Sequence, residues 1–436
     1  MMNQQSKAKK VLQALRSGLV PLEGVSLIST GNEAIFDALI NELIETTQGS
    51  SSFKFVIGNY GAGKTFIAST VREMAFARNM LVSTLTISQE NPFHKLEDFY
   101  KGLLRRLRLP DQPSIAALPI VMEEWMIAQE ERICSLYQLN KSNDKEVLNE
   151  MMHQCLKDAF HAMGQIDSSF SRAVRAYYQA RNQKDEVLSN AALGWIKGEK
   201  IRAETKKMMK VKGEVDRQQA LIFMQAILKM MKSASYKGWV VIVDEMETVL
   251  RLRTKTLRQM AYDNLRYLID EIMQNRFPGC FFLFTGTPEL LNSHLGFSSF
   301  TPLFDRVYAD KDLQFPNLRQ GLLYIEPWEK PHFIQTAEKV LKLHQEAYEW
   351  TSPPEKIYPF LQQYVEEFFD LRKKGYKLHP RAFLRIWIDL LDKQQIYPEA
   401  NFETKTLWTD FMLKKAQDTE NQQALIDDDN PIETTD

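Results

Sequence analysis

The sequence predicts an α/β protein in which helices flank a parallel sheet, with a large helical insertion and a helical C-terminal region. Three observations lead to this fold class. Residues 53–87 have the pattern of an apolar strand, a glycine-rich loop, a helix and a second strand, which is typical of a parallel sheet. Further β-branched and aromatic runs follow in the second half of the chain. Residues 110–236 and 328–415 instead space their apolar residues as helices do.

The individual elements follow in order from these patterns. Residues 7–47 predict a helix, a turn at 18–24 and an amphipathic helix with apolar residues four positions apart. Residues 53–58 predict a buried strand, 66–77 a helix and 80–87 a second strand. Later strands are predicted at 238–245, 279–286 and 322–327.

The chain has 436 residues, enough for two or three domains at ~150 residues each. Five parts are predicted. N-terminal helices and the first half of the α/β core occupy 1–110, and the helical insertion occupies 111–236. The second half of the core occupies 237–327, a helical domain 328–417, and an acidic disordered tail 418–436.

Composition excludes several classes of protein. Hydrophobic residues make up 44% and charged residues 25% of the chain, which excludes a collagen-like or wholly disordered polypeptide. Cys134, Cys155 and Cys280 are far apart and lack ligand spacing, which argues against a disulfide framework or a zinc site. No apolar run approaches the ~20 residues that span a bilayer, and no signal peptide is visible. We therefore expect a soluble, cytoplasmic protein with no membrane partner.

The charge is unevenly distributed along the chain. Lys and Arg number 55 against 56 Asp and Glu, but residues 418–436 hold seven acidic residues and no basic one. The preceding body therefore has 55 basic and 49 acidic residues, an excess that permits binding to phosphate or DNA without requiring it. We interpret the tail as a solvated end. The alternative is a nucleic-acid mimic that shields a basic groove.

The octapeptide GNYGAGKT at 58–65 satisfies the pattern GxxxxGK[ST] of a phosphate-binding loop. Its glycines let backbone N–H groups surround a phosphate, Lys64 offers a cation to the β- and γ-phosphates, and the Thr65 hydroxyl is a ligand for Mg²⁺. An accidental glycine-rich turn is the alternative, but the strand before and the helix after favour a site for ATP and Mg²⁺. The predicted nucleotide contacts are Gly58, Asn59, Tyr60, Gly61, Ala62, Gly63, Lys64, Thr65 and Phe66.

The apolar run WVVIVDE ends in Asp244 and Glu245. Carboxylates directly after a buried strand lie at the ligand-binding edge of a parallel sheet. We expect Asp244 to hold Mg²⁺ through its water shell and Glu245 to orient and polarise the attacking water. Alone, the pair would be interpreted as an ordinary polar strand end. Together with the loop at 58–65 it predicts ATP hydrolysis.

Further candidate residues lie at the end of the predicted strand at 279–286 and later in the chain. Thr285 or Thr287, in the segment Thr-Gly-Thr-Pro, is placed to sense the γ-phosphate or align the water, although the same residues also favour a β-turn. Arg306 and Arg381 are candidates for an arginine supplied to the phosphates from a neighbouring subunit or domain. A lone arginine is usually a solvated surface residue, so only the order of the motifs supports these two.

That order resembles the order of motifs in AAA+ ATPases, in particular the clade of origin-recognition initiators and related signalling ATPases. From about Ala14 to Arg306, with a looser continuation to Arg385, the chain also resembles the BREX (bacteriophage exclusion) ATP-binding proteins of the BrxD-like family. The phosphate loop is common to many ATPases, whereas DEMET together with GTPELL and SGLVP is more particular. The similar stretches are ALRSGLVPLEGVSLISTGNEAIF, FKFVIGNYGAGKTF, ALGWIKGE, YKGWVVIVDEMETVLRLR and FLFTGTPELLNSHLGFSSFTPLFDRV.

The resemblance implies an AAA+ P-loop core with a helical C-terminal lid domain. It implies that Lys64 and Thr65 bind nucleotide and Mg²⁺, that Asp244 and Glu245 are the metal and water-activating pair, and that Thr287 or Thr285 is the sensor. It makes Arg306 a candidate arginine finger and Arg381 a candidate lid residue. Two departures stand out: related ATPases often carry Gly-Arg-Glu where this chain has Gly31-Asn32-Glu33, and about 50 residues after Arg385 cannot hold the winged-helix module of the origin initiators.

Two functions are compatible with these features. The first is an ATPase of a phage-defence system that binds DNA, forms a nucleotide-dependent homo-oligomer and assembles with other defence proteins such as helicase or methyltransferase components. Its support is residues 197–217, with eight basic and four acidic residues, where Arg202, Lys206 and Lys210 would form one helical stripe. The second is a regulatory nucleotide switch that binds protein partners and not DNA. Its methionines would be core or partner-facing: Met208, Met209, Met230 and Met231.

Overall fold

The computed structural model describes residues 4–161, 168–307, 316–376, 378–400, 402 and 408. The predicted acidic tail at 418–436 lies outside these residues. Contacts along the chain define two compact units. The sheet unit consists of Glu33–Tyr60 and Thr70–Ile325, and the terminal unit consists of Met1–Asn32, Gly61–Ser69 and Glu326–Asp436.

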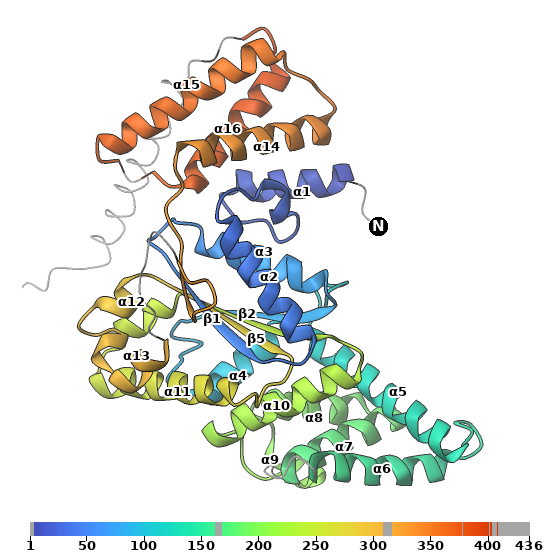
Figure 1. Ribbon diagram of the computed structural model, residues 1–436. Coiled ribbons are helices and arrows are strands. Elements are labelled where there is room, and N and C mark those ends of the chain that lie inside the picture. Colours follow the sequence, from blue (N-terminus) through green and yellow to red (C-terminus); the bar gives the residue numbers. More distant parts are fainter. Residues whose placement is uncertain are drawn as a thin grey trace, which may run out of the picture. The chain divides into compact units, whose positions relative to one another are not determined.

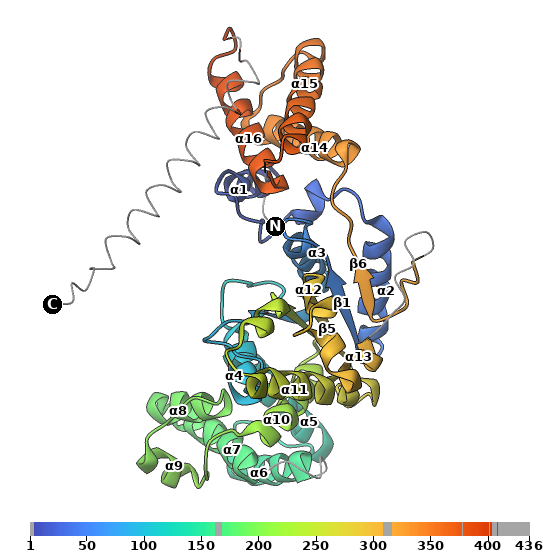
Figure 2. The same cartoon turned by 90° about the vertical axis from the view of Figure 1, so that its left-hand side faces the viewer.

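The sheet unit is built on a six-stranded sheet with the strand order β3-β2-β4-β5-β1-β6 (Figures 1 and 2). β3 runs antiparallel to β2, and every other neighbouring pair is parallel, which confirms the α/β prediction. The strands are β1 (Ser52–Ile57), β2 (Met80–Thr86), β3 (Leu107–Arg108), β4 (Gly238–Asp244), β5 (Cys280–Gly286) and β6 (Leu322–Tyr324).

The predicted strands are present, with small differences at their ends. β1 and β2, predicted as one strand–helix–strand unit, both lie in the sheet, but β4 and β5 come between them. β1 instead pairs with β5 and β6. β3 was not predicted, because two residues are too short for an alternating pattern.

The sheet is buried on both faces, which explains why its central strands are apolar throughout. Successive strand residues face opposite sides. Trp239, Val241 and Val243 of β4 share one hydrophobic core with residues of α4 (Leu96–Arg105), α10 (Arg217–Ser233) and α11 (Lys255–Met273). On the other face, α2 (Glu33–Thr47) lies against β5 (Figure 1).

A buried lysine fixes the segment that leads into β6. Lys54 of β1 is 2% exposed, and its ammonium group lies 3.0 Å from the Glu42 carboxylate. It also donates to three consecutive carbonyl oxygens, those of Leu318, Arg319 and Gln320, at 2.8 to 3.1 Å. A buried charge is tolerated when it is paired and hydrogen-bonded in this way. Lys54 therefore ties the start of β6 to β1.

The insertion between β3 and β4 is helical, as predicted, and contains no strand of the sheet among its described residues. Phe223 of α10 contacts the rings of Tyr100, Phe170 and Trp195, with centroids 6.3, 4.5 and 6.0 Å away. The Tyr100 hydroxyl donates to the Ile196 carbonyl at 2.6 Å, and burial raises the pKa of Tyr100. The insertion therefore shares its core with α4. Its helices before α10 are α5 (Ala117–Tyr137), α6 (Lys145–His161), α7 (Ser168–Gln183), α8 (Glu186–Ile196) and α9 (Ala203–Met209).

Short helices follow β4 and β5. They are the 3-10 helices η2 (Met246–Arg251) and η3 (Phe297–Ser299) and the α-helices α12 (Glu289–Asn292) and α13 (Thr301–Val307).

The terminal unit combines the two ends of the described chain. Its helices α1, α14, α15 and α16 pack together (Figure 2) and share one apolar core. This core includes Trp387, whose Nε1 donates to the Ala337 carbonyl at 3.0 Å. The first turns of α3 (Lys64–Phe76) also belong to this unit. The remaining elements are α1 (Gln4–Arg16), η1 (Val25–Ile28), α14 (Lys330–Tyr348), α15 (Pro354–Lys373) and α16 (Pro380–Ile396).

A polar network joins α1 to α14 and α16. Arg16 donates to the Asp392 carboxylate from Nε at 2.7 Å and from Nη2 at 2.5 Å, and Nη2 also donates to the Tyr348 hydroxyl. Asp392 also pairs with Nε2 of the fully buried His344 at 2.9 Å, while Nδ1 of His344 accepts from the Trp350 indole at 2.7 Å. Because an indole N–H can only donate, Nδ1 carries no proton and Nε2 does. Burial opposes ionisation of Asp392, but the bonds from His344 and Arg16 outweigh it and lower the pKa of Asp392.

We expect Asp392→Asn to lower the free energy of unfolding by about 2 kcal/mol at pH 7, because it removes charged hydrogen bonds. The folded pKa is below the unfolded value of about 3.9, so this stabilisation is present above that value and is lost as the pH falls through the folded pKa. The difference between wild type and variant, measured by urea unfolding, should be constant between about pH 8 and 5 and shrink below about pH 4.

Asp389→Asn is the matched control. Asp389 lies on the same helix but pairs with Lys393 at an exposed site, so its loss should change the unfolding free energy by less than about 1 kcal/mol. Equal losses in the two variants, or a difference that grows as the pH falls, would contradict the assignment.

Candidate functional site

Three strands of the sheet unit end together at one edge. β4, β5 and β1 are parallel neighbours, so Asp244, Gly286 and Gly58 leave the sheet at its carboxyl edge. The Gly58 N–H donates to the Gly286 carbonyl at 3.1 Å. The first residue of the predicted phosphate loop therefore lies at the same edge as the predicted metal residue.

Asp244 is held by its neighbours at this edge. The buried Thr285 hydroxyl donates to Oδ1 of Asp244, and the backbone N–H of Glu245 donates to the same oxygen at 3.0 Å. Asp244 is half-buried and Glu245 is exposed. These bonds fix the Asp244 carboxylate and leave the Glu245 side chain at the surface of the sheet unit.

Glu245 has a backbone conformation that is unusual for its type. Its φ is +60°, in the left-handed region, where it directly precedes η2. A non-glycine residue held there costs of order 1 kcal/mol and is often found at functional sites. Glu245 therefore forms the turn from β4 into η2.

The two candidate threonines differ in their contacts. Thr285 bonds to Asp244, as described, and is fully buried. Thr287 is 8% exposed, and its carbonyl accepts from the Leu290 N–H at 3.0 Å where α12 begins. The sequence left Thr285 and Thr287 as alternatives, and only the Thr285 hydroxyl has a described bond to the Asp244 carboxylate.

The tip of the phosphate loop belongs to the terminal unit. Gly61 and Gly63 have φ values of +81° and +103°, which favour glycine, and α3 begins at Lys64. Among the described residues, a Cβ at Gly63 would meet no atom within 4 Å. Lys64 is 8% exposed, and the flanking Tyr60 is 77% exposed. A glycine loop that opens directly onto a helix N-terminus and carries a lysine fits a phosphate ligand.

The donor set also fits Mg²⁺ bound together with phosphates. The Asp244 carboxylate in the sheet unit and the Thr65 hydroxyl in the terminal unit are each a ligand type that Mg²⁺ takes beside phosphate oxygens. The described residues hold no cluster of three or more His, Cys, Asp or Glu that could bind a metal ion. A metal site made by protein side chains alone is therefore not found in that part of the chain.

Other residues of the terminal unit lie around the loop tip. The ring of His379 packs against Gly61, and Phe66 meets Trp328 edge-on with centroids 6.3 Å apart. Arg381 is exposed in the first turn of α16. His379 was not among the residues predicted from the sequence, although its place directly before Pro380 marks it as the residue that caps α16.

Gly31 lies close to α14 within the terminal unit. Gly31 has a φ of +69°, and a Cβ there would lie 2.9 Å from the ring of His332 in α14. Close packing and positive φ therefore explain the glycine at this position.

Arg306 is engaged within the sheet unit. Its guanidinium group pairs with Asp270 of α11, and its Nη1 donates to the Pro302 carbonyl at 2.5 Å. The side chain is 32% exposed. An arginine finger role would require this ion pair to open.

The predicted stripe of Arg202, Lys206 and Lys210 is wrong. α9 has only seven residues, so Arg202 caps its start in an extended conformation and Lys210 caps its end with φ +55°. Lys206 pairs with Glu214. The short helix ends because Lys210 turns into the left-handed region, and the exposed cations of this segment do not share one helical face.

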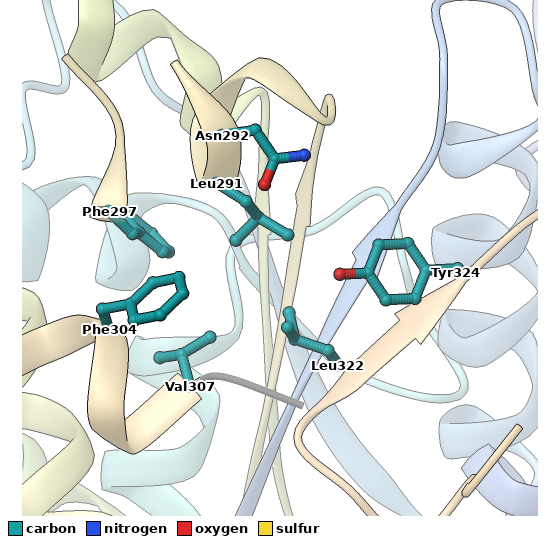
Figure 3. A pocket seen from close by; sticks show the side chains of 7 residues that line it. All are labelled: Leu291, Asn292, Phe297, Phe304, Val307, Leu322 and Tyr324. Atoms are coloured by element: carbon teal, nitrogen blue, oxygen red, sulfur yellow. The ribbon is translucent and has the colours of Figure 1, made fainter. Parts of the chain in front are cut away.

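Two cavities in the sheet unit lie away from the predicted residues. A small one of about 20 Å³, room for a single water, is lined by α12, α13 and β6 (Figure 3). A groove of about 570 Å³ lies between α5, α6 and α10, and its lining includes Trp125, Arg132, Leu136 and Lys229. Neither contains a sequence-predicted site residue.

Comparison with known proteins decides the family. The family model of the BREX system ATP-binding protein BrxC/D matches residues 4–409. The chain belongs to this family. The resemblance to the BREX ATP-binding proteins is thereby confirmed.

Membership in the BrxC/D family implies nucleotide binding and a role in BREX phage defence, with other components of the system as partners. A search of curated proteins finds no match. Among the described residues, no helix is both long and apolar enough to span a membrane.

Proposed function

We propose that the chain is a Mg²⁺-dependent ATPase with an AAA+ core and a helical lid at 328–417, acting in BREX defence. The observation that carries this proposal is the placing of Gly58, Asp244 and Thr285 at one sheet edge, with the loop 58–65 leaving that edge. The test is the release of phosphate from ATP by the full chain with Mg²⁺ or with EDTA, each with and without DNA.

Each residue has a defined task in this proposal. The loop N–H groups and the Lys64 ammonium bind phosphate charge, and Thr65 and Asp244 hold Mg²⁺, which neutralises that charge when bound. Glu245 accepts the proton of the attacking water or orients it. Thr285 keeps Asp244 in place, which supports Thr287 as the residue left to sense the phosphates. Arg381 is the lid contact.

We expect slow ATP hydrolysis by isolated chains, because one positive charge at the phosphates, that of Arg306, has to come from a neighbouring copy. Arg306→Ala should lower ATP hydrolysis on the order of 100-fold or more with little change in ATP affinity. Mixing Arg306→Ala with Glu245→Gln should restore part of the activity, since a mixed interface can pair an intact Glu245 with an intact Arg306.

Asp270→Asn is the control for this experiment, because it breaks the same ion pair but keeps the arginine. If it lowered activity as much as Arg306→Ala, the role of Arg306 would be structural. No recovery on mixing, with a monomer in every nucleotide state by light scattering, would exclude the finger.

We also propose that the chain binds DNA, mainly through the excess of basic residues in the body. Binding should be largely independent of sequence and weaken steeply with salt, because phosphate contacts release counterions. Replacing the exposed Arg202, Lys207 and Lys210 with Glu should weaken binding at least about tenfold at low salt. Gel retardation at 50 and 200 mM salt measures this effect.

Lys373 and Lys374, both exposed in the proposed lid, are the matched control when changed to Glu. Equal affinity of the triple variant and the wild type would remove residues 197–217 from the DNA interface.

A regulatory switch that binds protein partners and not DNA is the second candidate. Met208 is 68% exposed and Met230, itself 2% exposed, lines the groove between α5, α6 and α10, whereas Met209 and Met231 are buried in the core. The exposed Leu136 at the groove between α5, α6 and α10 also favours this candidate. DNA affinity that does not change with salt, or no DNA binding at all, would favour it over the first.

A further inference from the structure

An imidazole ring covers the tip of the phosphate loop. A Cβ built on Gly61 would lie 2.5 Å from Nδ1 of His379, 3.1 Å from Cγ and 3.3 Å from Cε1. These distances mean that the ring packs directly on the Gly61 backbone, with Nδ1 as the nearest atom. Both residues belong to the terminal unit, so the contact lies within one compact body.

The backbone of His379 is fixed by a packed helix. It caps the start of α16 with φ −108° and ψ 157°, and Pro380 follows in the first turn. One turn later, the Phe383 carbonyl accepts from the Tyr364 hydroxyl at 2.7 Å, and Phe383 and Trp387 are fully buried. The imidazole therefore projects from a rigid support, in contrast to a side chain on a free loop.

We propose that His379 is a positioning residue for nucleotide, contacting the phosphates of a nucleotide held by the loop and so coupling its binding to α16. The inference rests on the proposed nucleotide site. Imidazole N–H groups are good partners for phosphate oxygens, and the nearest ring nitrogen already faces the loop. The ligand class is a polyphosphate, and neither the adenine nor the ribose is part of this contact.

The first test compares variants of His379 by isothermal titration calorimetry with ATP and with inorganic tripolyphosphate. His379→Ala should bind both about tenfold more weakly than wild type, which is the effect of one charge-assisted hydrogen bond. His379→Asn keeps a donor near the position of Nδ1 and should recover most of the affinity. Arg385→Ala, an exposed arginine on the next turn of α16, should bind as wild type does.

The outcomes separate this inference from the proposed function. If wild type bound neither ligand, the nucleotide site itself would be wrong. If wild type bound both ATP and tripolyphosphate and His379→Ala bound them with the same affinity, only the proposed role of His379 would be disproved. A loss confined to ATP would also overturn the proposal, because it would indicate a contact with the nucleoside.

The second test is a double-mutant cycle that uses the geometry of the loop. Gly61→Ala introduces both backbone strain and a clash with His379, whereas Gly63→Ala introduces strain at φ +103° with no atom of the described residues in the way. Adding His379→Ala to Gly61→Ala should restore thermal stability, because it removes the clash. Adding His379→Ala to Gly63→Ala should restore none. Strict additivity in both pairs would show that His379 does not pack on Gly61.

Discussion

Lys64→Ala should weaken ATP binding by about 100-fold, because the bound phosphates would lose charge-assisted bonds from the Lys64 ammonium group that already exist in the ground state. Lys64 is 8% exposed and lies in the first turn of α3. Isothermal titration calorimetry with ATP measures the loss directly.

The melting temperature of the unliganded variant is the control for folding. It should stay within a few degrees of wild type, while the rise in melting temperature that ATP gives to wild type should disappear. Unchanged affinity in a folded variant would show that the loop does not bind phosphate through Lys64.

Glu245→Gln should keep ATP affinity and lower hydrolysis on the order of 100-fold or more. The carboxylate acts on the water only along the reaction path, whereas binding is determined by charge present beforehand. Gln has nearly the same shape as Glu, so the substitution should not change the energetic cost of the left-handed backbone at φ +60°. Single-turnover hydrolysis and nucleotide affinity, measured on the same preparation, separate the two effects.

Glu289→Gln is the matched control, because it removes an equal charge from an exposed position in α12 after the neighbouring strand. It should leave turnover within about twofold of wild type, as expected for a surface charge. Wild-type hydrolysis by Glu245→Gln would assign the activation of water to another residue.

The fold was predictable from the sequence wherever a single segment has a recognisable local pattern. The apolar runs of β1, β2, β4 and β5 and the glycine loop are local patterns, and the structure has strands at each of them. β3 and the strand order were not predictable. A two-residue strand has no period, and the neighbours of β1 depend on crossovers that join segments far apart in the sequence.

The candidate site was predictable in its residue types and not in its contacts. The pattern GxxxxGK[ST] and a strand ending in two carboxylates identify residues from short windows of sequence. The bond from Thr285 to Asp244 joins two strands, and the packing of His379 on Gly61 joins residues more than 300 positions apart. The stripe of Arg202, Lys206 and Lys210 failed because helical spacing was assumed beyond the point where Lys210 ends α9.

The register of β2 has a consequence for how this chain could change over evolution. Val82 pairs with Arg108 of β3 on one side and with Val240 of β4 on the other, so the segment between them starts and returns two strand spacings apart, about 10 Å. Because its two ends lie close together, such a segment can be replaced, lengthened or shortened without a change in the strand order of the sheet. The ring of Tyr100 on α4 limits such replacement, because it packs against Phe223, which lies within the segment between β3 and β4. Any replacement module would have to supply its own apolar partner for that ring and an acceptor for the Tyr100 hydroxyl, which now donates to the Ile196 carbonyl of α8. Lineages should therefore differ more in α6 and α9 than in α8 and α10.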